Sequence, residues 1–125
     1  MKRKSVAPVY SMCVQPAFII GTNNEDGTYN FAPITWLSAT HEDGVKYLLV
    51  ISMAGTKNTK QNVIRTGIFS ANLVSTEMLP LMDYLGSNNV GRCGHICNAS
   101  YAVSSDVRGK HMPILQRTMN YYLFI

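Results

Sequence analysis

Five turn-forming residues at positions 23–27, Asn-Asn-Glu-Asp-Gly, separate two strand-like runs near the start of the chain. The run before them, residues 13–22, contains an apolar triplet at 18–20 that is typical of a strand buried on both faces. The run after them begins with residues 29–31. Because Asn, Asp and Gly tolerate the positive φ angles of tight turns, this pattern predicts an antiparallel hairpin and, with it, a fold built on a sheet.

Three later runs extend the β pattern along the chain. Residues 45–51 are dense in β-branched and aromatic side chains and predict a central strand, and residues 68–74 alternate as a strand does. The last run, residues 120–125, is strand-like and mostly apolar. Because such a strand needs a neighbour, we expect that another subunit completes the sheet or that the chain is shorter than the fold it came from.

Two short helices are predicted between the strands. Residues 58–61 resemble a capping box, with Asn58 as the polar N-cap and Gln61 at the third helical position, and Gly67 ends this helix. Apolar residues at spacings of three and four predict a second helix over residues 75–85. Together, the runs predict a mainly β protein with short helices.

Length and composition predict one folded domain over residues 1–125. The hydrophobic fraction of 46% and the charged fraction of 14% are those of a globular protein with a buried core. The three cysteines, an odd number with no secretory signal ahead of them, predict free thiols and a cytoplasmic protein. No run approaches the roughly 20 apolar residues that span a bilayer, so no membrane role is expected.

The net charge of +4 comes from 11 Lys and Arg residues that are spread along the chain. Only residues 2–4 form a dense basic run, which is too little for a nucleic-acid surface, so no nucleic-acid partner is expected. A small β-barrel that binds nucleic acid is accordingly the least favoured function. A mild positive balance fits a small anionic ligand such as a phosphate equally well.

Residues 30–38 mix small hydroxyl side chains with apolar ones around the only tryptophan, Trp36. The amides and hydroxyls of such a strand suit a flat aromatic ligand, with Pro33 breaking the ladder where the ligand enters. The alternative is a tryptophan that packs in a β core. The sequence leaves both explanations open.

The step from Lys57 to Thr59 places a positive charge and a hydroxyl at the predicted start of a helix. A helix N-terminus offers unpaired amides and the positive end of the helix dipole, so these residues predict an anion site. The alternative is a surface helix with a good cap. No glycine-rich nucleotide-binding fingerprint is present, which disfavours Rossmann and P-loop folds.

Residues with metal or acid–base chemistry form no convincing group. Cys93, His95 and Cys97 have a spacing of two and would share one face of a strand, but a C-x₂-C motif is missing and Cys13 is the one further cysteine. Most acidic residues lie in predicted turns or helices, which leaves no pair of catalytic carboxylates. We therefore predict neither a metal site nor a catalytic residue.

Three segments, in this order and spacing, resemble the flavin reductase-like family of the FMN-binding split barrel, which includes the flavoredoxins. They are residues 26–36 (DGTYNFAPITW), 57–62 (KNTKQN) and 66–72 (TGIFSAN). The resemblance implies a six-stranded antiparallel split β-barrel that pairs as a homodimer, with FMN held non-covalently near the subunit interface. Family members continue beyond the position of Ile125, so it also implies a barrel shortened at its C-terminal end.

The resemblance also implies an activity and roles for individual residues. Hydride would pass from NAD(P)H to FMN, as in a flavin reductase or an electron carrier of the flavoredoxin type, with no acid or base residue required. A flavin-binding module without enzymatic activity is the alternative. Asn30 and Asn72 would brace loops. The residues implied to border the flavin are Thr35, Trp36, Leu37 and Ser38, those lining it from the next strand are Ser52 and Met53, and those holding its phosphate are Lys57, Asn58 and Thr59.

Overall fold

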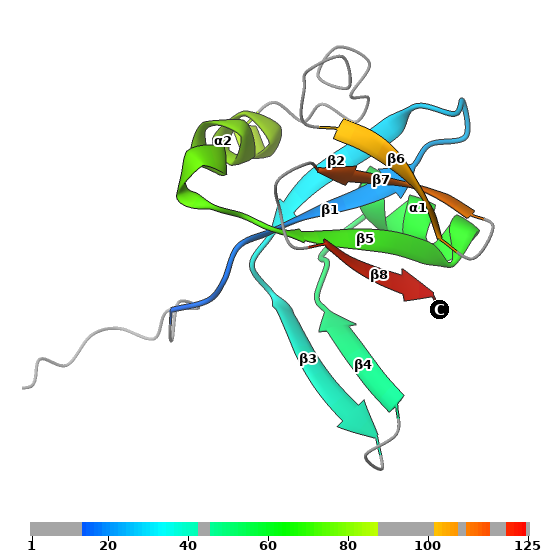
Figure 1. Ribbon diagram of the computed structural model, residues 1–125, viewed down its shortest axis with the longest axis horizontal. Helices are drawn as coiled ribbons and strands as arrows, with labels where there is room; N and C mark the ends of the chain where they lie inside the picture. The colour runs from blue at the N-terminus through cyan, green and yellow to red at the C-terminus, as the bar shows by residue number, and fades with distance from the viewer. Residues whose placement is uncertain (1–13, 43–45, 88–101, 108–109, 116–119, 125) are drawn as a thin grey trace, which may run out of the picture.

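The computed structural model describes residues 14–42, 46–87, 102–107, 110–115 and 120–124, and they form a mainly β protein with short helices (Figure 1). Two helices, α1 (Asn58–Thr66) and α2 (Leu79–Ser87), accompany the strands, and a 3₁₀ turn, η1 (Thr76–Met78), leads into α2. The strands are β1 (Phe18–Asn23), β2 (Tyr29–Ile34), β3 (Leu37–Glu42), β4 (Lys46–Ile51), β5 (Ile68–Leu73), β6 (Ala102–Val107), β7 (Lys110–Leu115) and β8 (Asn120–Phe124).

Four of the strands form an antiparallel sheet in the order β2-β1-β5-β8. β3 pairs with β4, and β6 pairs with β7, as two separate ribbons. The described residues thus hold eight strands, where the resemblance implies six. The hairpin predicted around residues 23–27 is confirmed, since Asn23 pairs with Tyr29 at the end of the β1–β2 ladder. The last predicted strand is β8, which pairs with β5 of the same chain.

Alternate residues of β1 face two different cores. Ile19 packs with side chains of α2 and β7, whereas Phe18 and Ile20 pack with side chains of α1 and β5. Elements therefore cover both faces of the sheet, as the apolar triplet predicts. Full burial of one such side chain contributes about 1.5–3 kcal/mol to stability, so β1 contributes substantially to the stability of the fold.

Two polar side chains of β5, Ser70 and Asn72, are fully buried beside β7. Ser70 donates to the carbonyl oxygen of Pro113 at 2.5 Å, and Asn72 accepts from the N–H of Leu115 at 3.0 Å. Asn72 also donates to the carbonyl oxygen of Ile19 at 2.7 Å. The bonds to Pro113 and Leu115 attach β7 to the main sheet, with which it shares no strand ladder. Asn72 thus braces strands rather than loops.

The stretch at residues 30–38 is divided between two strands. β2 ends at Ile34, Thr35 and Trp36 form the connection, and β3 begins at residue 37. The prediction that Pro33 breaks the ladder is wrong, because Pro33 stays in register opposite Ile19. It lies on a strand at the edge of the sheet, where the missing N–H of proline is tolerated.

The prediction of a central strand over residues 45–51 is also wrong. Among the described strands, β4 pairs with β3 alone, and the β3–β4 ribbon extends away from the main sheet (Figure 1). Val50 is 58% exposed. β-Branched and aromatic residues suit any pleated, half-buried surface, so their density does not distinguish a central strand from a ribbon.

The start of α1 differs from the prediction, and its end agrees with it. The capping box at residues 58–61 is wrong, because Lys57 is the N-cap and no side chain caps the helix. Gly67 ends α1 in the left-handed conformation, with φ of 69°, as predicted. The second predicted helix is divided into η1 and α2. Neither helix in the described part of the chain combines the length and apolar character that crossing a membrane requires.

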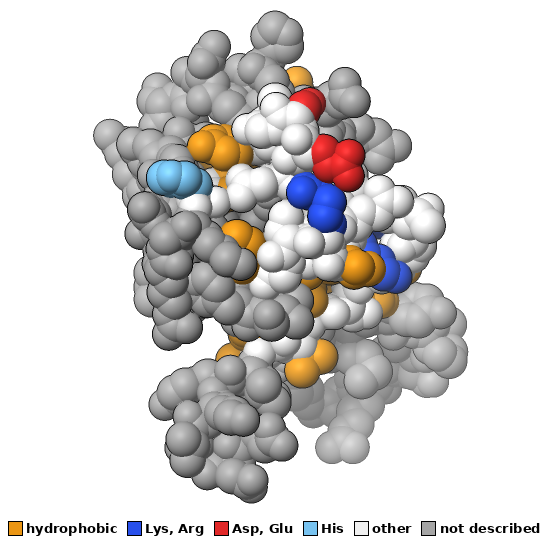
Figure 2. Space-filling model, turned by 90° about the vertical axis from the view of Figure 1, so that its right-hand side faces the viewer, with side chains coloured by type: hydrophobic (Ala, Val, Ile, Leu, Met, Phe, Trp, Pro, Cys, Tyr) orange, Lys and Arg blue, Asp and Glu red, His pale blue; other side chains and the backbone are white. Residues whose placement is uncertain are grey.

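Few charged side chains are visible among the described residues on the face that carries α1 and the β1–β2 turn (Figure 2). This face includes one place where basic and acidic side chains lie next to each other. An ion pair links α1 to the turn, with Arg65 Nε 3.8 Å from Glu25 Oε1. Arg65 also donates to the carbonyl oxygen of Asn23 at 2.5 Å, so α1 is held to the hairpin at the surface as well as in the core.

Candidate functional site

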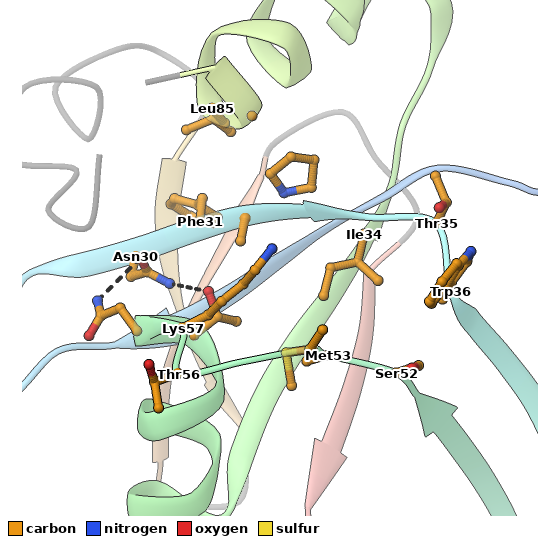
Figure 3. A pocket seen from close by; sticks show the side chains of 16 residues that line it. Asn30, Phe31, Ile34, Thr35, Trp36, Ser52, Met53, Thr56, Lys57 and Leu85 are labelled. Atoms are coloured by element: carbon orange, nitrogen blue, oxygen red, sulfur yellow. Dashed lines mark hydrogen bonds between the residues drawn. The ribbon is translucent and has the colours of Figure 1, made fainter. Parts of the chain in front are cut away.

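A pocket of about 530 Å³ lies between β2, the connection from β4 to α1, and the end of α2 (Figure 3). Its volume falls in the range of about 300–1,000 Å³ that is typical of small-molecule sites. The residues that line it are Asn30, Phe31, Ala32, Pro33, Ile34, Thr35, Trp36, Ser52, Met53, Ala54, Thr56, Lys57, Asn58, Thr59, Leu85 and Gly86.

The pocket has a tryptophan end and a helix end (Figure 3). At the tryptophan end, Thr35 and Trp36 follow β2, and Ser52 follows β4. At the helix end, Thr56 and Lys57 lead into α1. The two candidate sites that the sequence suggests separately are thus opposite ends of one pocket.

Apolar side chains lie between the two ends. Ile34 from β2 and Met53 from the connection after β4 occupy the middle of the pocket (Figure 3). Both pack against the core that α1 covers. Their positions are therefore held by the core, and the middle of the pocket suits a flat apolar ring.

At the tryptophan end, the two walls are joined by a backbone hydrogen bond. The N–H of Ser52 donates to the carbonyl oxygen of Trp36 at 3.0 Å. Trp36 is 46% exposed, so the alternative of a tryptophan buried in a β core is wrong. Its indole offers a stacking surface, and the hydroxyl groups of Thr35 and Ser52 offer hydrogen bonds to the polar edge of a ring.

At the helix end, α1 begins beside the pocket without a side-chain cap. The first N–H groups of a helix lack partners within the helix, and its N-terminus carries partial positive charge, so it attracts anions. Lys57 is exposed, and its side chain extends along the pocket (Figure 3). Among the described residues that line the pocket, Lys57 is the one charged side chain. This end is therefore electropositive.

Asn30 of β2 holds the first turn of α1. Its side-chain amide donates to Thr59 Oγ1 at 2.8 Å and to Thr22 Oγ1 at 3.1 Å, and all three residues are buried. The side-chain amide of Asn58 donates to Asn24 Oδ1 at 2.9 Å. The amide of Asn58 is therefore engaged with the β1–β2 hairpin and connects the start of α1 to it.

The residues that the resemblance implies as flavin contacts all line the pocket except Leu37 and Ser38. Leu37 packs against the core, and Ser38 is exposed on β3. Sequence reasoning missed Leu85 and Gly86, because nothing in the local pattern shows that the end of α2 packs beside β2. That the lining residues bind FMN stays a prediction.

The described lining of the pocket includes no acidic residue, histidine or cysteine. Within the described ranges, no three His, Cys, Asp or Glu side chains come together as a metal site, and Cys93, His95 and Cys97 lie outside those ranges. What the described lining offers a ligand is hydrogen bonds, apolar contact and one positive charge.

Several solved structures with the same fold carry names that refer to flavin or FMN. Flavoredoxin from Methanosarcina acetivorans matches with a TM-score of 0.74 and 16% identity, over 96% of this chain and 63% of that one. An FMN-binding protein from Thermus thermophilus matches with a TM-score of 0.71 and 20% identity, over 99% of this chain and 67% of that one. A Shewanella frigidimarina protein named as a flavin reductase with a split barrel domain matches with a TM-score of 0.65 and 14% identity, over 88% of this chain and 55% of that one.

These matches establish the fold. The split barrel expected from the sequence, and the resemblance that implied it, are confirmed at this level. The chain spans between 55% and 67% of the length of the three structures. No protein-family model and no curated protein match the sequence.

Proposed function

We propose that the pocket binds FMN, with the phosphate at the start of α1 and the flavin ring along Ile34 and Met53 toward Trp36. The observation that carries this proposal is that one pocket joins an electropositive helix end to a half-exposed tryptophan. FMN requires both features, because it carries a phosphate at one end and a flat aromatic ring at the other. The proteins that share the fold support the proposal, since their names describe flavin-binding proteins.

The residues present fit this ligand. Lys57 supplies a positive charge for the phosphate, and the buried Thr59 supplies a hydroxyl group beside it. Ile34 and Met53 supply apolar contact for the middle of the ring. Thr35 and Ser52 remain for the polar ring edge.

We further propose that the protein acts as an NAD(P)H-dependent flavin reductase or as an electron carrier of the flavoredoxin type. FMN, when bound, supplies the redox chemistry, because its ring accepts hydride from a nicotinamide and passes electrons on. The chain supplies binding and orientation: the helix end holds the phosphate, and Trp36 and Met53 limit where the ring can lie. Because FMN would supply the redox chemistry and the chain the binding, the reaction requires no acid or base side chain in the pocket lining.

We also propose that the protein works as a cytoplasmic homodimer with the ligand near the subunit interface. The half-exposed Trp36 supports this arrangement, because a second subunit over the tryptophan end would cover an aromatic surface that one chain leaves open to solvent. Size-exclusion chromatography with light scattering, with and without FMN, measures the subunit number. A mass of one chain at all concentrations would contradict the dimer.

The experiment that tests the function is an absorbance spectrum of purified protein mixed with FMN and then gel-filtered. We expect the flavin bands to stay with the protein and to bleach when NADH or NADPH is added without oxygen. Retained flavin that does not bleach with either nucleotide would favour a flavin-binding module without enzymatic activity. Protein that elutes colourless, and that shows no saturable binding of FMN by titration, would contradict the proposal as a whole.

A further inference from the structure

Asn30 lines the pocket and also belongs to the hydrogen-bond network behind it. We infer that Asn30 is a positioning residue, which acts through Thr59 and directs the proton of the Thr59 hydroxyl into the helix end of the pocket, toward the phosphate of FMN. The inference rests on the proposed function. Its physical basis is the direction of the hydrogen bonds, since a hydroxyl oxygen that accepts a bond from an amide keeps its own proton for another partner.

Asp26 fixes the direction of the network at one end. A carboxylate can only accept hydrogen bonds. Asp26 Oδ1 accepts one from the hydroxyl group of Thr28, with 2.5 Å between the two oxygens. The oxygen of Thr28 in turn accepts from Asn24 Nδ2 at 2.9 Å. Asn24 therefore directs its nitrogen toward the turn and its oxygen toward α1.

Arg65 fixes the same direction from the other end. A guanidinium only donates, and Arg65 Nη2 donates to Asn62 Oδ1 at 3.2 Å. Asn62 therefore turns its nitrogen inward and donates to Asn24 Oδ1 at 2.8 Å. The orientation of a side-chain amide is assigned from such partners, and here an obligatory acceptor and an obligatory donor assign Asn24 in the same way.

Asn58 and Asn30 continue the same order of donors and acceptors from Asn24 to the pocket. Asn58 Nδ2 donates to Asn24 Oδ1 at 2.9 Å and to Asn30 Oδ1 at 3.4 Å. With its oxygen toward Asn58, Asn30 turns its nitrogen to Thr59 and donates to Oγ1 at 2.8 Å (Figure 3). No hydrogen bond within the described residues takes up the hydroxyl proton of Thr59, which is 4% exposed and lines the pocket. An anion there is the acceptor that this arrangement favours.

The same substitution at two places in the network has opposite expected effects. Asn30→Asp places an acceptor where Asn30 donates to Thr59, so the Thr59 proton turns toward the new carboxylate and away from the ligand. Asn24→Asp keeps an acceptor toward Asn58 and Asn62, so the direction toward the pocket is preserved. Both substitutions add one negative charge to the same network, which makes Asn24→Asp the matched control.

The test is a double-mutant cycle with Thr59→Val, in which calorimetric titration measures the affinity for FMN and for riboflavin, which lacks the phosphate. In the wild type and with Asn24→Asp, we expect Thr59→Val to weaken FMN binding about tenfold, as loss of a hydrogen bond to a charged group does. In the Asn30→Asp background, Thr59→Val should weaken FMN binding by less than about twofold, because the Thr59 hydroxyl no longer donates to the phosphate there. Riboflavin binding should change by less than about twofold on Thr59→Val in every background. If Thr59→Val does not fold, Thr59→Ala takes its place.

An equal cost of Thr59→Val in all three backgrounds would overturn the role of Asn30, because the loss in Asn30→Asp would then be charge repulsion alone. A loss of riboflavin affinity as large as the loss of FMN affinity would also overturn it, since it would show a structural effect. Retention of FMN affinity by Thr59→Ser, which keeps the hydroxyl, would support it. A wild-type protein that binds neither flavin would contradict the proposed function itself, and the role of Asn30 with it.

Discussion

Gly21 lies so close to Pro113 that a Cβ at position 21 would be 2.6 Å from the Pro113 carbonyl oxygen. The same Cβ would lie 2.6 Å from Ser70 Oγ, so β1, β5 and β7 meet at a point where only glycine fits. We expect Gly21→Ala to lower the free energy of unfolding by about 1–3 kcal/mol, because the β7 backbone must move away. Denaturant titration followed by circular dichroism measures this change.

Gly55→Ala is the control for that substitution. No atom lies within 4 Å of a Cβ at position 55, and the cost there comes only from the positive φ of 67°. We expect about 1–2 kcal/mol for this conformational strain. A loss of less than about 0.5 kcal/mol on Gly21→Ala would contradict the expected clash between β1 and β7.

Asn72 joins β1 to β7 by side-chain hydrogen bonds, and its replacement should loosen β7. Asn72→Leu removes the side-chain hydrogen bonds to the carbonyl oxygen of Ile19 and to the N–H of Leu115. Each such hydrogen bond contributes about 0.5–1.5 kcal/mol to stability. We expect lower stability and faster hydrogen exchange at the Leu115 amide. Gln61→Leu on the exposed face of α1 is the control, with an expected change within about 0.5 kcal/mol.

Lys57 should contribute to the binding of FMN but not of riboflavin. Because the side chain is exposed, solvent screens its charge, and we expect Lys57→Ala to weaken FMN binding by about 1 kcal/mol. Lys60→Ala is the matched control, since Lys60 lies on the same helix and does not line the pocket. Titration of each variant with both flavins measures the effect. Equal losses for the two lysines would show long-range attraction rather than contact with the phosphate.

Trp36 should contribute equally to the binding of FMN and of riboflavin, because it lies at the end of the pocket away from α1. We expect Trp36→Ala to weaken both by about 0.5–1.5 kcal/mol, the range for aromatic pairs. As the chain has one tryptophan, flavin binding should also quench the protein's tryptophan emission. Tyr84→Ala removes an exposed aromatic side chain of α2 that does not line the pocket, and it should leave both affinities unchanged. A flavin that binds without quenching would not lie beside Trp36.

The elements that the sequence predicts correctly depend on neighbouring residues. The β1–β2 turn and the end of α1 at Gly67 follow from residues that tolerate positive φ angles, and β5 follows from its alternating pattern. The β3–β4 ribbon was not predictable in the same way. Whether a strand is central depends on which distant strands pair with it, and that choice does not appear in its own composition.

The two ends of the candidate site were visible in the sequence, but their common pocket was not. Trp36 and Lys57 lie 21 positions apart, and the sequence gives no distance between a strand and a helix end. Leu37 and Ser38 were also implied as flavin contacts but do not line the pocket. They lie on β3, beyond the connection at which the chain leaves the pocket. Local patterns therefore identify groups that suit a ligand, and the tertiary fold decides which of them meet.

The β3–β4 ribbon leaves and rejoins the body of the molecule through the two walls of the tryptophan end. Trp36 precedes the ribbon, Ser52 follows it, and the hydrogen bond between their backbones closes its base. Because this bond joins the two walls where the ribbon begins, the direction of the projecting arm and the position of both walls are coupled. A contact that held the arm would therefore also hold the tryptophan end of the pocket.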